Sequence, residues 1–344
     1  MRDSYDLGKE LGAGAYARVY AATEKATGNE CAVKAINKEL ADTPMLKNEV
    51  AILEKVAGHP HCMDIKAVVE DKGYLWLVST CYSGGELFDA IVDKIERGEM
   101  YTEVHAATVA RQLLEAISHC HHLGVLHRDI KPENVLLRDN TGNLDVVLVD
   151  FGIAKEFLVR GTRQTEVLGT YAFMAPEFAR GSYDERSDAW SVGVVLYIML
   201  CGNMPFGGDT DDEILRSVSV GRYAMDQPVW ATVSDDCKAL VTGLMERDVE
   251  KRLTVEAALR TPWVVSCGLG RSQDLGASVI APLREWMSAH AFDKAVISVV
   301  ASMMEGSTSS EDRTDLAHIE AAFAAVDTDG VCRIPPLISS YMQN

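Results

Sequence analysis

One stretch of eight residues, "HRDIKPEN" at 127–134, restricts the chemistry of this chain more than any other. Asp129 can orient an attacking hydroxyl and accept its proton. Lys131 can neutralise a phosphoryl group in transit, and Asn134 can hold a Mg²⁺ ion. Each of these three side chains therefore has a role in one and the same reaction.

A second carboxylate follows at the end of a β-like run. The stretch "LDVVLVDFG" ends in Asp150, Phe151 and Gly152, and a metal that bridges nucleotide phosphates would need an acidic ligand there. Hard cations prefer oxygen ligands, so Asn134 and Asp150 suit Mg²⁺ better than zinc, and Mn²⁺ could replace it.

The first ninety residues predict a β hairpin with a glycine-rich turn. Gly12 and Gly14 would let backbone N–H groups approach phosphates, although Ala17 stands where the common pattern has a third glycine. A second β-like run carries Lys34, and the helix-like "LKNEVAILEKV" carries Glu49. A lysine on a strand needs a carboxylate to hold its ammonium toward a phosphate oxygen, and Glu49 can supply it. Taken alone, Glu49 could equally belong to a solvated helix face.

These motifs occur in a fixed order along the chain. The Gly-rich loop, Lys34, Glu49, "HRDIKPEN", "DFG", "APE" and Asp188 make it resemble a eukaryotic-type protein kinase from about Tyr5 to Trp263. The resemblance implies an α+β bilobal fold, with a small β-rich N-terminal lobe and a larger helical C-terminal lobe. We expect a kinase domain at 5–263, a junction or autoinhibitory-like helical segment at 264–310 and a degenerate EF-hand-like segment at 311–344.

The resemblance also assigns roles residue by residue. Lys34 resembles the lysine that contacts the α and β phosphates of ATP, Glu49 resembles its helix partner, and the aspartate of "HRD" resembles the catalytic base. Lys131 in "DIKPEN" points to Ser and Thr hydroxyls as acceptors. Glu177 of "APE" resembles a carboxylate that forms a structural ion pair with an arginine, here Arg252. The implied ATP-binding residues are Leu11, Gly12, Gly14, Val19, Ala32, Lys34, Ser79, Thr80, Cys81, Glu86 and Leu136.

Five residues bear on specificity. Ser79 matches the position that controls access behind the adenine, and a serine there should leave the back pocket open to bulky adenine mimics. It also suits an ordinary buried strand. Thr80 and Cys81 would offer backbone carbonyl and N–H groups to the adenine. Glu86 and Glu133 match carboxylates that face an upstream arginine in basophilic relatives, which predicts an Arg-x-x-Ser/Thr preference. A ribose hydroxyl is an equally good partner for Glu86.

The activation segment carries a candidate replacement for a phosphate. Arg128 would need an anion from "KEFLVRGTRQTEVLGTYAF" to order that segment. Several relatives carry a phosphorylated threonine four residues before the position of Thr170, where this chain has Glu166. A built-in carboxylate could thus replace the phosphate, while Thr165 beside it keeps phosphorylation open.

Composition argues against several other classes. Of 344 residues, 47% are apolar and 24% are charged, and no apolar run reaches the roughly 18 residues that span a membrane. A net charge of -18 argues against nucleic acid as the main partner and mildly favours basic substrates. With no leader-like N-terminus, and Arg2 where myristoylation needs glycine, we expect a cytoplasmic protein without a membrane anchor. Monomer is the default.

The eight cysteines include no Cys-x-x-Cys pair, which favours reduced thiols. Two clusters, "HPHC" at 59–62 and "HCHH" at 119–122, could suggest a metal. Neither has the spacing of a zinc site, so helix and turn residues are the better interpretation.

After Ser266, "CGLGRSQDLGAS" predicts a flexible connection. The following stretch predicts an amphipathic helix, with Leu283, Trp286 and Met287 on its apolar side. Such a helix can pack into a core, or it can serve as an inhibitory or docking segment. It has fewer basic residues than a calmodulin target usually offers.

The stretch 322–338 begins like an EF-hand loop, with Asp327 and Asp329 at the first and third positions. The pattern then fails, because Cys332 replaces the turn glycine and Ile338 replaces the bidentate glutamate. The order of kinase, junction and EF-hand resembles the calcium-dependent protein kinases, in which several EF-hands follow. We expect this single degenerate loop not to hold Ca²⁺, although its helices could still pack on the kinase or bind a regulator.

We therefore predict an ATP- and Mg²⁺-dependent protein-serine/threonine kinase with a divergent regulatory tail, acting on proteins with basic residues upstream of Ser or Thr. The alternative is a kinase-shaped nucleotide-binding or scaffold module that acts through its tail with little catalysis. A pseudokinase would normally lack the lysine, the base or the metal aspartate, and none is missing. A small-molecule phosphotransferase is disfavoured because "GTYAFMAPE" resembles a peptide-positioning segment.

Overall fold

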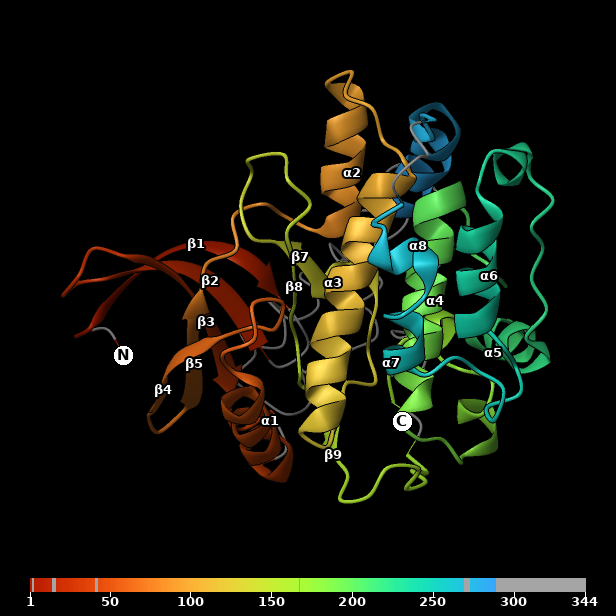
Figure 1. Ribbon diagram of the computed structural model, residues 1–344. Coiled ribbons are helices and arrows are strands. Elements are labelled where there is room, and N and C mark those ends of the chain that lie inside the picture. Colours follow the sequence, from red (N-terminus) through yellow and green to blue (C-terminus); the bar gives the residue numbers. More distant parts are fainter. Residues whose placement is uncertain (2, 14–16, 41–42, 167, 269–272, 289–344) are drawn as a thin grey trace. The chain divides into compact units, whose positions relative to one another are not determined.

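A computed structural model describes residues 1, 3–13, 17–40, 43–166, 168–268 and 273–288 (Figure 1). The chain divides into two compact units. The first contains residues 1–43 and 66–81 together with the described residues after 284, and the second contains 44–65 and 82–284. The predicted Gly14 and the EF-hand-like segment 311–344 lie outside the described residues.

A five-stranded sheet in the order β1-β2-β3-β5-β4 makes up the first unit (Figure 1). Neighbouring strands from β1 to β5 in this order pair antiparallel. The first two pairs are between strands consecutive in the chain, whereas α1 and β4 lie between β3 and β5 in the sequence. The strands are β1 (Tyr5–Ala13), β2 (Ala17–Glu24), β3 (Glu30–Asn37), β4 (Ile65–Glu70) and β5 (Tyr74–Thr80).

Side-chain alternation gives this sheet two different faces. One face carries a buried apolar cluster of Tyr5, Ala22, Cys31, Val33 and Val78. The strand register pairs Val19 with Lys34 and Ala32 with Ser79, and these positions alternate with the cluster. Four of the residues predicted to bind ATP therefore share the other face: Val19, Ala32, Lys34 and Ser79.

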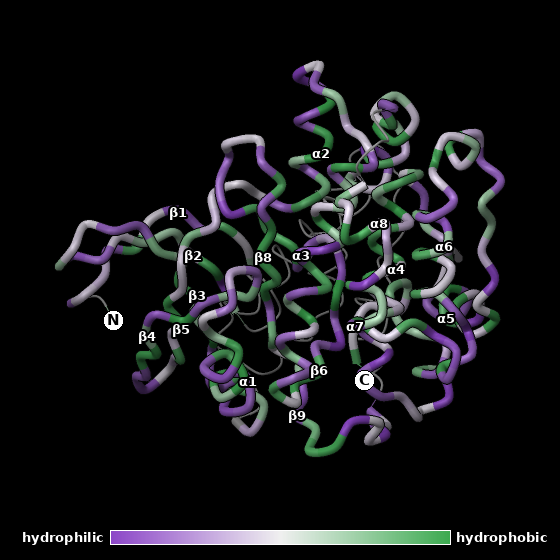
Figure 2. Tube along the Cα trace, in the orientation of Figure 1, coloured by the Kyte–Doolittle hydropathy of each residue, from purple (hydrophilic) through white to green (hydrophobic). Residues whose placement is uncertain are grey.

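Helices dominate the second unit, and α3 and α4 pack side by side at its centre (Figure 1). A hydrophobic run extends through α4 (Figure 2), where every residue after Arg186 is buried. The helices are α1 (Thr43–Val56), α2 (Leu87–Glu96), α3 (Glu103–His122), α4 (Arg186–Cys201), α5 (Asp211–Val220), α6 (Asp235–Leu244), α7 (Val255–Ala258) and α8 (Pro262–Val265). The short strands are β6 (Val125–Leu126), β7 (Val135–Leu137), β8 (Val146–Leu148) and β9 (Lys155–Glu156), and the 3-10 turns are η1 (Pro132–Asn134), η2 (Tyr171–Phe173), η3 (Phe178–Arg180) and η4 (Pro228–Ala231).

The expected mixed α and β fold class is confirmed, with a β-rich sheet unit and a mainly helical unit. Within the described residues, no helix is both long enough and apolar enough to cross a membrane.

The second unit continues beyond Trp263, where the sequence predicts that the kinase domain ends. The N–H of Tyr101 donates to Asp274 Oδ1 at 3.0 Å, and the N–H of Leu275 donates to the carbonyl of Tyr101 at 2.7 Å. Residues 276–288 form a helix in which Val279 and Leu283 are fully buried. The sequence predicts a flexible connection here, but its described part is attached to the second unit. The side chain of Asp274 and the backbone of Leu275 are both hydrogen-bonded to Tyr101.

Candidate active site

One buried carboxylate, that of Asp188, is hydrogen-bonded to the backbone of the loop between β6 and η1. Asp188 of α4 accepts hydrogen bonds from the backbone N–H groups of His127 and Arg128, both at 3.0 Å. Its Oδ2 also lies 2.9 Å from His121 Nε2. Arg128 has a φ of +72°, a left-handed conformation that costs free energy in a non-glycine residue. Asp188 thus stabilises the strained start of the loop.

Asp188 remains charged although it is 1% exposed. Burial alone would raise its pKa, but the hydrogen bond and charge of His121, the charge of His127 and the backbone N–H bond of His127 together lower it. A charged carboxylate accepts stronger hydrogen bonds than a neutral one, which suits its contacts with the loop.

Asp129 lies at the centre of the loop and contacts three neighbours. Its Oδ2 accepts a hydrogen bond from Asn134 Nδ2 at 3.0 Å and lies 2.9 Å from Lys131 Nζ. Its Oδ1 accepts from the hydroxyl of Thr170 at 3.0 Å and from the N–H of the same residue at 3.2 Å. The side chain is 13% exposed. The structure therefore brings the predicted base, lysine and amide together, and adds a threonine hydroxyl.

Lys131 bridges the same group of atoms. Its Nζ donates to Thr170 Oγ1 at 2.9 Å, so this ammonium and Asp129 contact one hydroxyl from two sides. Burial alone would lower the pKa of Lys131, but the charges of Asp129, Glu133 and Asp150 outweigh it and raise the pKa above its usual value. The lysine therefore stays positively charged across the neutral range.

Asn134 and Asp150 suit a hard cation. Both bonds that Asn134 Nδ2 donates go to Asp129, which orients the amide and directs its carbonyl oxygen elsewhere. Asp150 has a φ of +61°. A Cβ on Gly152 would stand 3.2 Å from Asp150 Oδ1 and 3.8 Å from Glu49 Oε2, so the missing side chain makes room for both carboxylates. Oxygen donors with two acids close by fit Mg²⁺.

Glu166 of the activation segment occupies the position expected of an anion. Its Oε2 accepts from Arg128 Nη1 at 2.9 Å, and its Oε1 lies 2.8 Å from Lys155 Nζ. Hydrogen bonds from Lys155 and Arg128 lower the pKa of the carboxyl group. The hydroxyl of Tyr183 donates to the Glu166 carbonyl at 2.6 Å. Thr165, next to it, is exposed.

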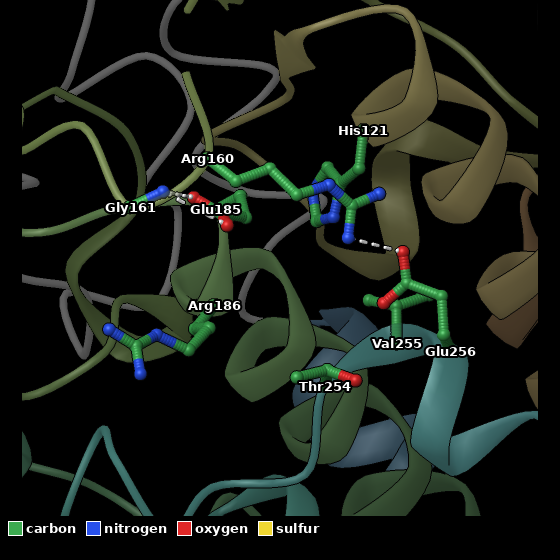
Figure 3. Close-up of a pocket in the computed structure, with 8 residues that line it drawn as sticks. All are labelled: His121, Arg160, Gly161, Glu185, Arg186, Thr254, Val255 and Glu256. Atoms are coloured by element: carbon green, nitrogen blue, oxygen red, sulfur yellow. Dashed lines mark hydrogen bonds and ion pairs between the residues drawn. The ribbon is translucent and has the colours of Figure 1, made fainter.

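The middle of the activation segment is tied to α4 and α7. Arg160 Nη1 lies 2.7 Å from Glu256 Oε1, and the N–H of Gly161 donates to Glu185 Oε2 at 2.9 Å (Figure 3). These residues line a pocket of about 320 Å³ together with Thr254 and others. The segment is therefore held at its middle as well as at Glu166.

Its far end is fixed by the buried pair of Glu177 and Arg252. Arg252 Nη1 and Nη2 donate to the two carboxylate oxygens at 2.5 and 2.9 Å. The guanidinium carbon also lies 5.0 Å from the ring centre of Trp190. Two parallel hydrogen bonds and a stacked ring make this the arrangement of a structural anchor.

The remaining predicted residues lie on both units. Leu11 and Gly12 are on β1, Thr80 ends β5, and Cys81 follows it. In the second unit, Glu86 precedes α2 and its backbone bridges to Leu136 of β7, while Glu133 lies in η1. Because Lys34 and Glu49 belong to different units, their pairing stays a prediction.

Sequence reasoning listed Asp188 as a motif residue without giving it a role, and it gave no role to three further residues that shape this site: His121, Lys155 and Tyr183. One signal was present, because a lone aspartate in the apolar stretch "SDAWSVGVVLYIML" must be paired when that helix is buried. The other three lie on separate elements, and their spacing along the chain gives no sign that they meet.

Comparison with known proteins agrees with the geometry. Residues 5–264 match the protein kinase domain family. Calcium-dependent protein kinase 10 of Oryza sativa subsp. japonica is 35% identical over 333 residues, which cover 96% of this chain and 54% of that protein. Calcium-dependent protein kinase 24 of Arabidopsis thaliana is 35% identical over 329 residues (94% and 54%). Calcium-dependent protein kinase 5 of Plasmodium falciparum is 33% identical over 335 residues (96% and 57%). The chain spans about half the length of these relatives.

Proposed function

The chain belongs to the protein kinase family, and we propose that it transfers the γ-phosphoryl group of ATP to Ser and Thr hydroxyls of proteins. The observation that carries this proposal is the contact with Thr170. Asp129 Oδ1 accepts from that hydroxyl at 3.0 Å, and Lys131 Nζ lies 2.9 Å from the same oxygen. The site thus already holds an aliphatic alcohol between a base and a cation, as the reaction requires of its substrate.

In this mechanism Asp129 orients the substrate hydroxyl and accepts its proton. Lys131, kept charged by its acidic neighbours, offsets the negative charge on the transferring group. Asn134 and Asp150 would hold Mg²⁺, which neutralises charge on the nucleotide phosphates when it is bound. Asp188 is a positioning residue: it does not touch the substrate hydroxyl, but it fixes the backbone from which Asp129 extends.

ATP binding is assigned to the face of the sheet that carries Val19, Ala32, Lys34 and Ser79. Lys34 contacts the α and β phosphates in this proposal, and Thr80 and Cys81 offer backbone groups to the adenine. Ser79 is small and buried, so bulky adenine mimics should bind.

Substrates of this enzyme would carry an arginine three residues before the acceptor. Glu86 and Glu133 support this preference, because Glu133 is part of "HRDIKPEN" and Glu86 bridges to Leu136, two residues after that stretch. The acidic chain as a whole, with a net charge of -18, favours the same class of substrate.

Two regulatory proposals follow. Glu166 already occupies the cationic site between Arg128 and Lys155, so activity should not require phosphorylation of the activation segment.

The degenerate EF-hand-like loop lacks the bidentate ligand, because Ile338 stands at that position, so calcium should not activate this chain.

The decisive experiment is phosphate transfer from ATP to an Arg-x-x-Ser peptide, measured with excess EGTA and with micromolar free Ca²⁺. We expect equal rates in both, and a fall of about 10²–10⁴ in kcat for Asp129→Asn, since a positioned base contributes that much. Asp139→Asn is the matched control, because Asp139 lies in the loop after β7, where its side chain accepts hydrogen bonds from the N–H and hydroxyl of Thr141.

Binding of Mg-ATP, measured by calorimetry, separates the alternatives. If Mg-ATP binds but no phosphate reaches this peptide or a broad protein panel, the chain is a nucleotide-binding module. A large stimulation by calcium would instead overturn the proposal for the EF-hand-like loop.

A further inference from the structure

Two His/Cys segments that are far apart in the sequence meet in the second unit. Cys62 lies in the loop after α1, and Cys120 lies in the last turn of α3. Their Sγ atoms are 4.0 Å apart, and the two residues are 3% and 0% exposed. Cys201 and Cys237 are also free and buried in this unit.

Imidazoles lie next to this pair on its outer side. His59 Nδ1 is 3.8 Å from Cys62 Sγ, and the His59 ring stacks on His119 with ring centres 4.8 Å apart. Both histidines are half-buried. No group of three or more His, Cys, Asp or Glu side chains among the described residues is arranged to hold a metal ion.

The two thiols are not equivalent. The hydrogen bond from Cys120 lowers the pKa of Cys62 in spite of burial, and the hydrogen bond and charge of His59 lower it further. The same thiol contact and burial raise the pKa of Cys120. A thiolate beside a protonated thiol is the arrangement of an attacking and a resolving cysteine.

We propose that Cys62 and Cys120 are a peroxide-sensitive dithiol that closes to a disulfide and ties the loop after α1 to α3. The Cys62 thiolate attacks hydrogen peroxide, displaces hydroxide and becomes a sulfenic acid. The Cys120 sulfur then attacks the Cys62 sulfur, its proton leaves with the hydroxyl group, and water is released. The displaced hydroxide takes up the proton that Cys62 released when it ionised, so one dithiol and one peroxide give one disulfide and two waters, and the two sulfurs supply both electrons.

Closure would move a segment that leads into the candidate active site. A disulfide requires the sulfurs to approach from 4.0 Å to about 2.05 Å. Cys62 forms an isolated parallel bridge with Leu148 of β8, and the N–H of Met63 donates to the Leu148 carbonyl at 2.9 Å. Asp150 follows two residues later, so the crosslink acts on the strand that positions the metal carboxylate.

The first test is chemical and does not depend on the proposed function. The full chain is treated with hydrogen peroxide, its remaining thiols are alkylated under denaturing conditions, and nonreduced peptides are analysed by mass spectrometry. We expect a crosslinked peptide that joins Cys62 to Cys120, is lost with dithiothreitol and is absent from Cys62→Ala and Cys120→Ala. In Cys120→Ala, dimedone should label the sulfenic acid at Cys62.

Cys201 and Cys237 serve as internal controls, because burial raises the pKa of both thiols and they should stay alkylatable. The proposal is overturned if Cys62 and Cys120 also stay alkylatable in excess peroxide. It is equally overturned if Cys62 reaches the sulfinic acid without any crosslink, or if the purified chain holds a stoichiometric metal that both alanine variants lose.

A second readout tests the link to the active site and rests on the proposed kinase activity. Oxidised protein should transfer phosphate between about twofold and thirtyfold more slowly, the range expected for energetic coupling between neighbouring sites. Dithiothreitol should restore the rate, and Cys62→Ala should be insensitive to peroxide. An unchanged rate in protein that carries the crosslink would refute the coupling.

Discussion

At the scale of single residues, the carboxylate of Glu166 occupies the site that we expected a phosphate on the activation segment to fill. It contacts two cations from different elements, Arg128 at the catalytic loop and Lys155 in β9. Its side chain is 50% exposed, so each contact is weakened by water. Glu166 therefore contributes more by its position than by the free energy of its ion pairs. Through Arg128, it links the activation segment to the residue next to Asp129.

Replacing this charge should slow phosphate transfer without abolishing it. For Glu166→Gln we expect kcat to fall by about twofold to tenfold, since exposed ion pairs contribute little each and here two are lost. Glu156→Gln is the matched control, because Glu156 pairs with Lys55 nearby but not with Arg128. A rate equal to that of the unchanged chain would mean that Arg128 needs no anion.

Gly152 sets the space around Asp150, the carboxylate that we propose binds Mg²⁺. A Cβ there would be 3.2 Å from Asp150 Oδ1, closer than most real Cβ contacts, so Gly152→Ala should displace the carboxylate by a few tenths of an ångström. We expect kcat to fall by about tenfold, and the Mg²⁺ concentration needed for half-maximal rate to rise. In Gly207→Ala, where a Cβ meets nothing within 4 Å, both values should stay unchanged.

At the scale of elements, the helix at 276–288 belongs to the second unit through its first two turns. Gly202, at the end of α4, has a φ of +76°, and a Cβ there would lie 2.8 Å from the Val279 carbonyl and 2.9 Å from Pro282 Cβ. Leu283 is fully buried. The sequence left open whether this helix packs into a core or acts as a separate segment, and its described start is packed.

Removal of its buried leucine should therefore destabilise the whole unit. Leu283→Ala should lower the free energy of unfolding by about 2–5 kcal/mol, the usual cost of such a cavity. Urea unfolding followed by tryptophan fluorescence measures this, with Ser278→Ala on the exposed side of the same helix as the control. An unchanged midpoint for Leu283→Ala would show that the helix is not part of the cooperative unit.

At the scale of the whole molecule, stability against acid depends on buried carboxylates that stay charged. The pKa of Asp188 lies below its ordinary value of 3.8. A depressed carboxyl pKa stabilises the fold above the unfolded pKa, and this contribution is lost as the pH falls through the folded pKa. We therefore expect constant stability from this group at neutral pH and a loss that begins near pH 4.

Asp188→Asn tests that expectation. It should cost about 3–5 kcal/mol at pH 7, because it breaks a buried network, and the difference from the unchanged chain should narrow below pH 4. For Asp211, burial raises the pKa, so Asp211→Asn should show the opposite sign and stabilise slightly at pH 7. Urea midpoints at several pH values measure both effects. If stability falls with pH in the same way in Asp188→Asn and in the unchanged chain, Asp188 does not have a lowered pKa in the folded state.

Most of the groups to which we assign the reaction were identified from the sequence alone, and the structure brings several of them together. A single stretch of six residues contains Asp129, Lys131 and Asn134, so their combined chemistry can be inferred from that stretch alone. Asp150 directly follows a run of residues that predicts a strand. Such signals are local, and they need no knowledge of what lies across the fold. The alternation of residue types predicted the first hairpin, whereas the α+β fold class followed from the resemblance to protein kinases. Helix α4 is buried on all sides, so it has no amphipathic period from which it could be predicted.

Contacts between distant segments were decided only by the tertiary structure. Asp188 reaches the loop at 127–128 from 60 residues away, and Cys62 meets Cys120 across 58 residues. Spacing argued against each His/Cys cluster as a zinc site when it was considered alone, and only the fold shows that the two clusters lie together. Sequence determines which chemistry each residue can perform. Packing of helices and strands determines which of those residues share a site, because proximity between distant residues depends on how all the buried surfaces fit together at once.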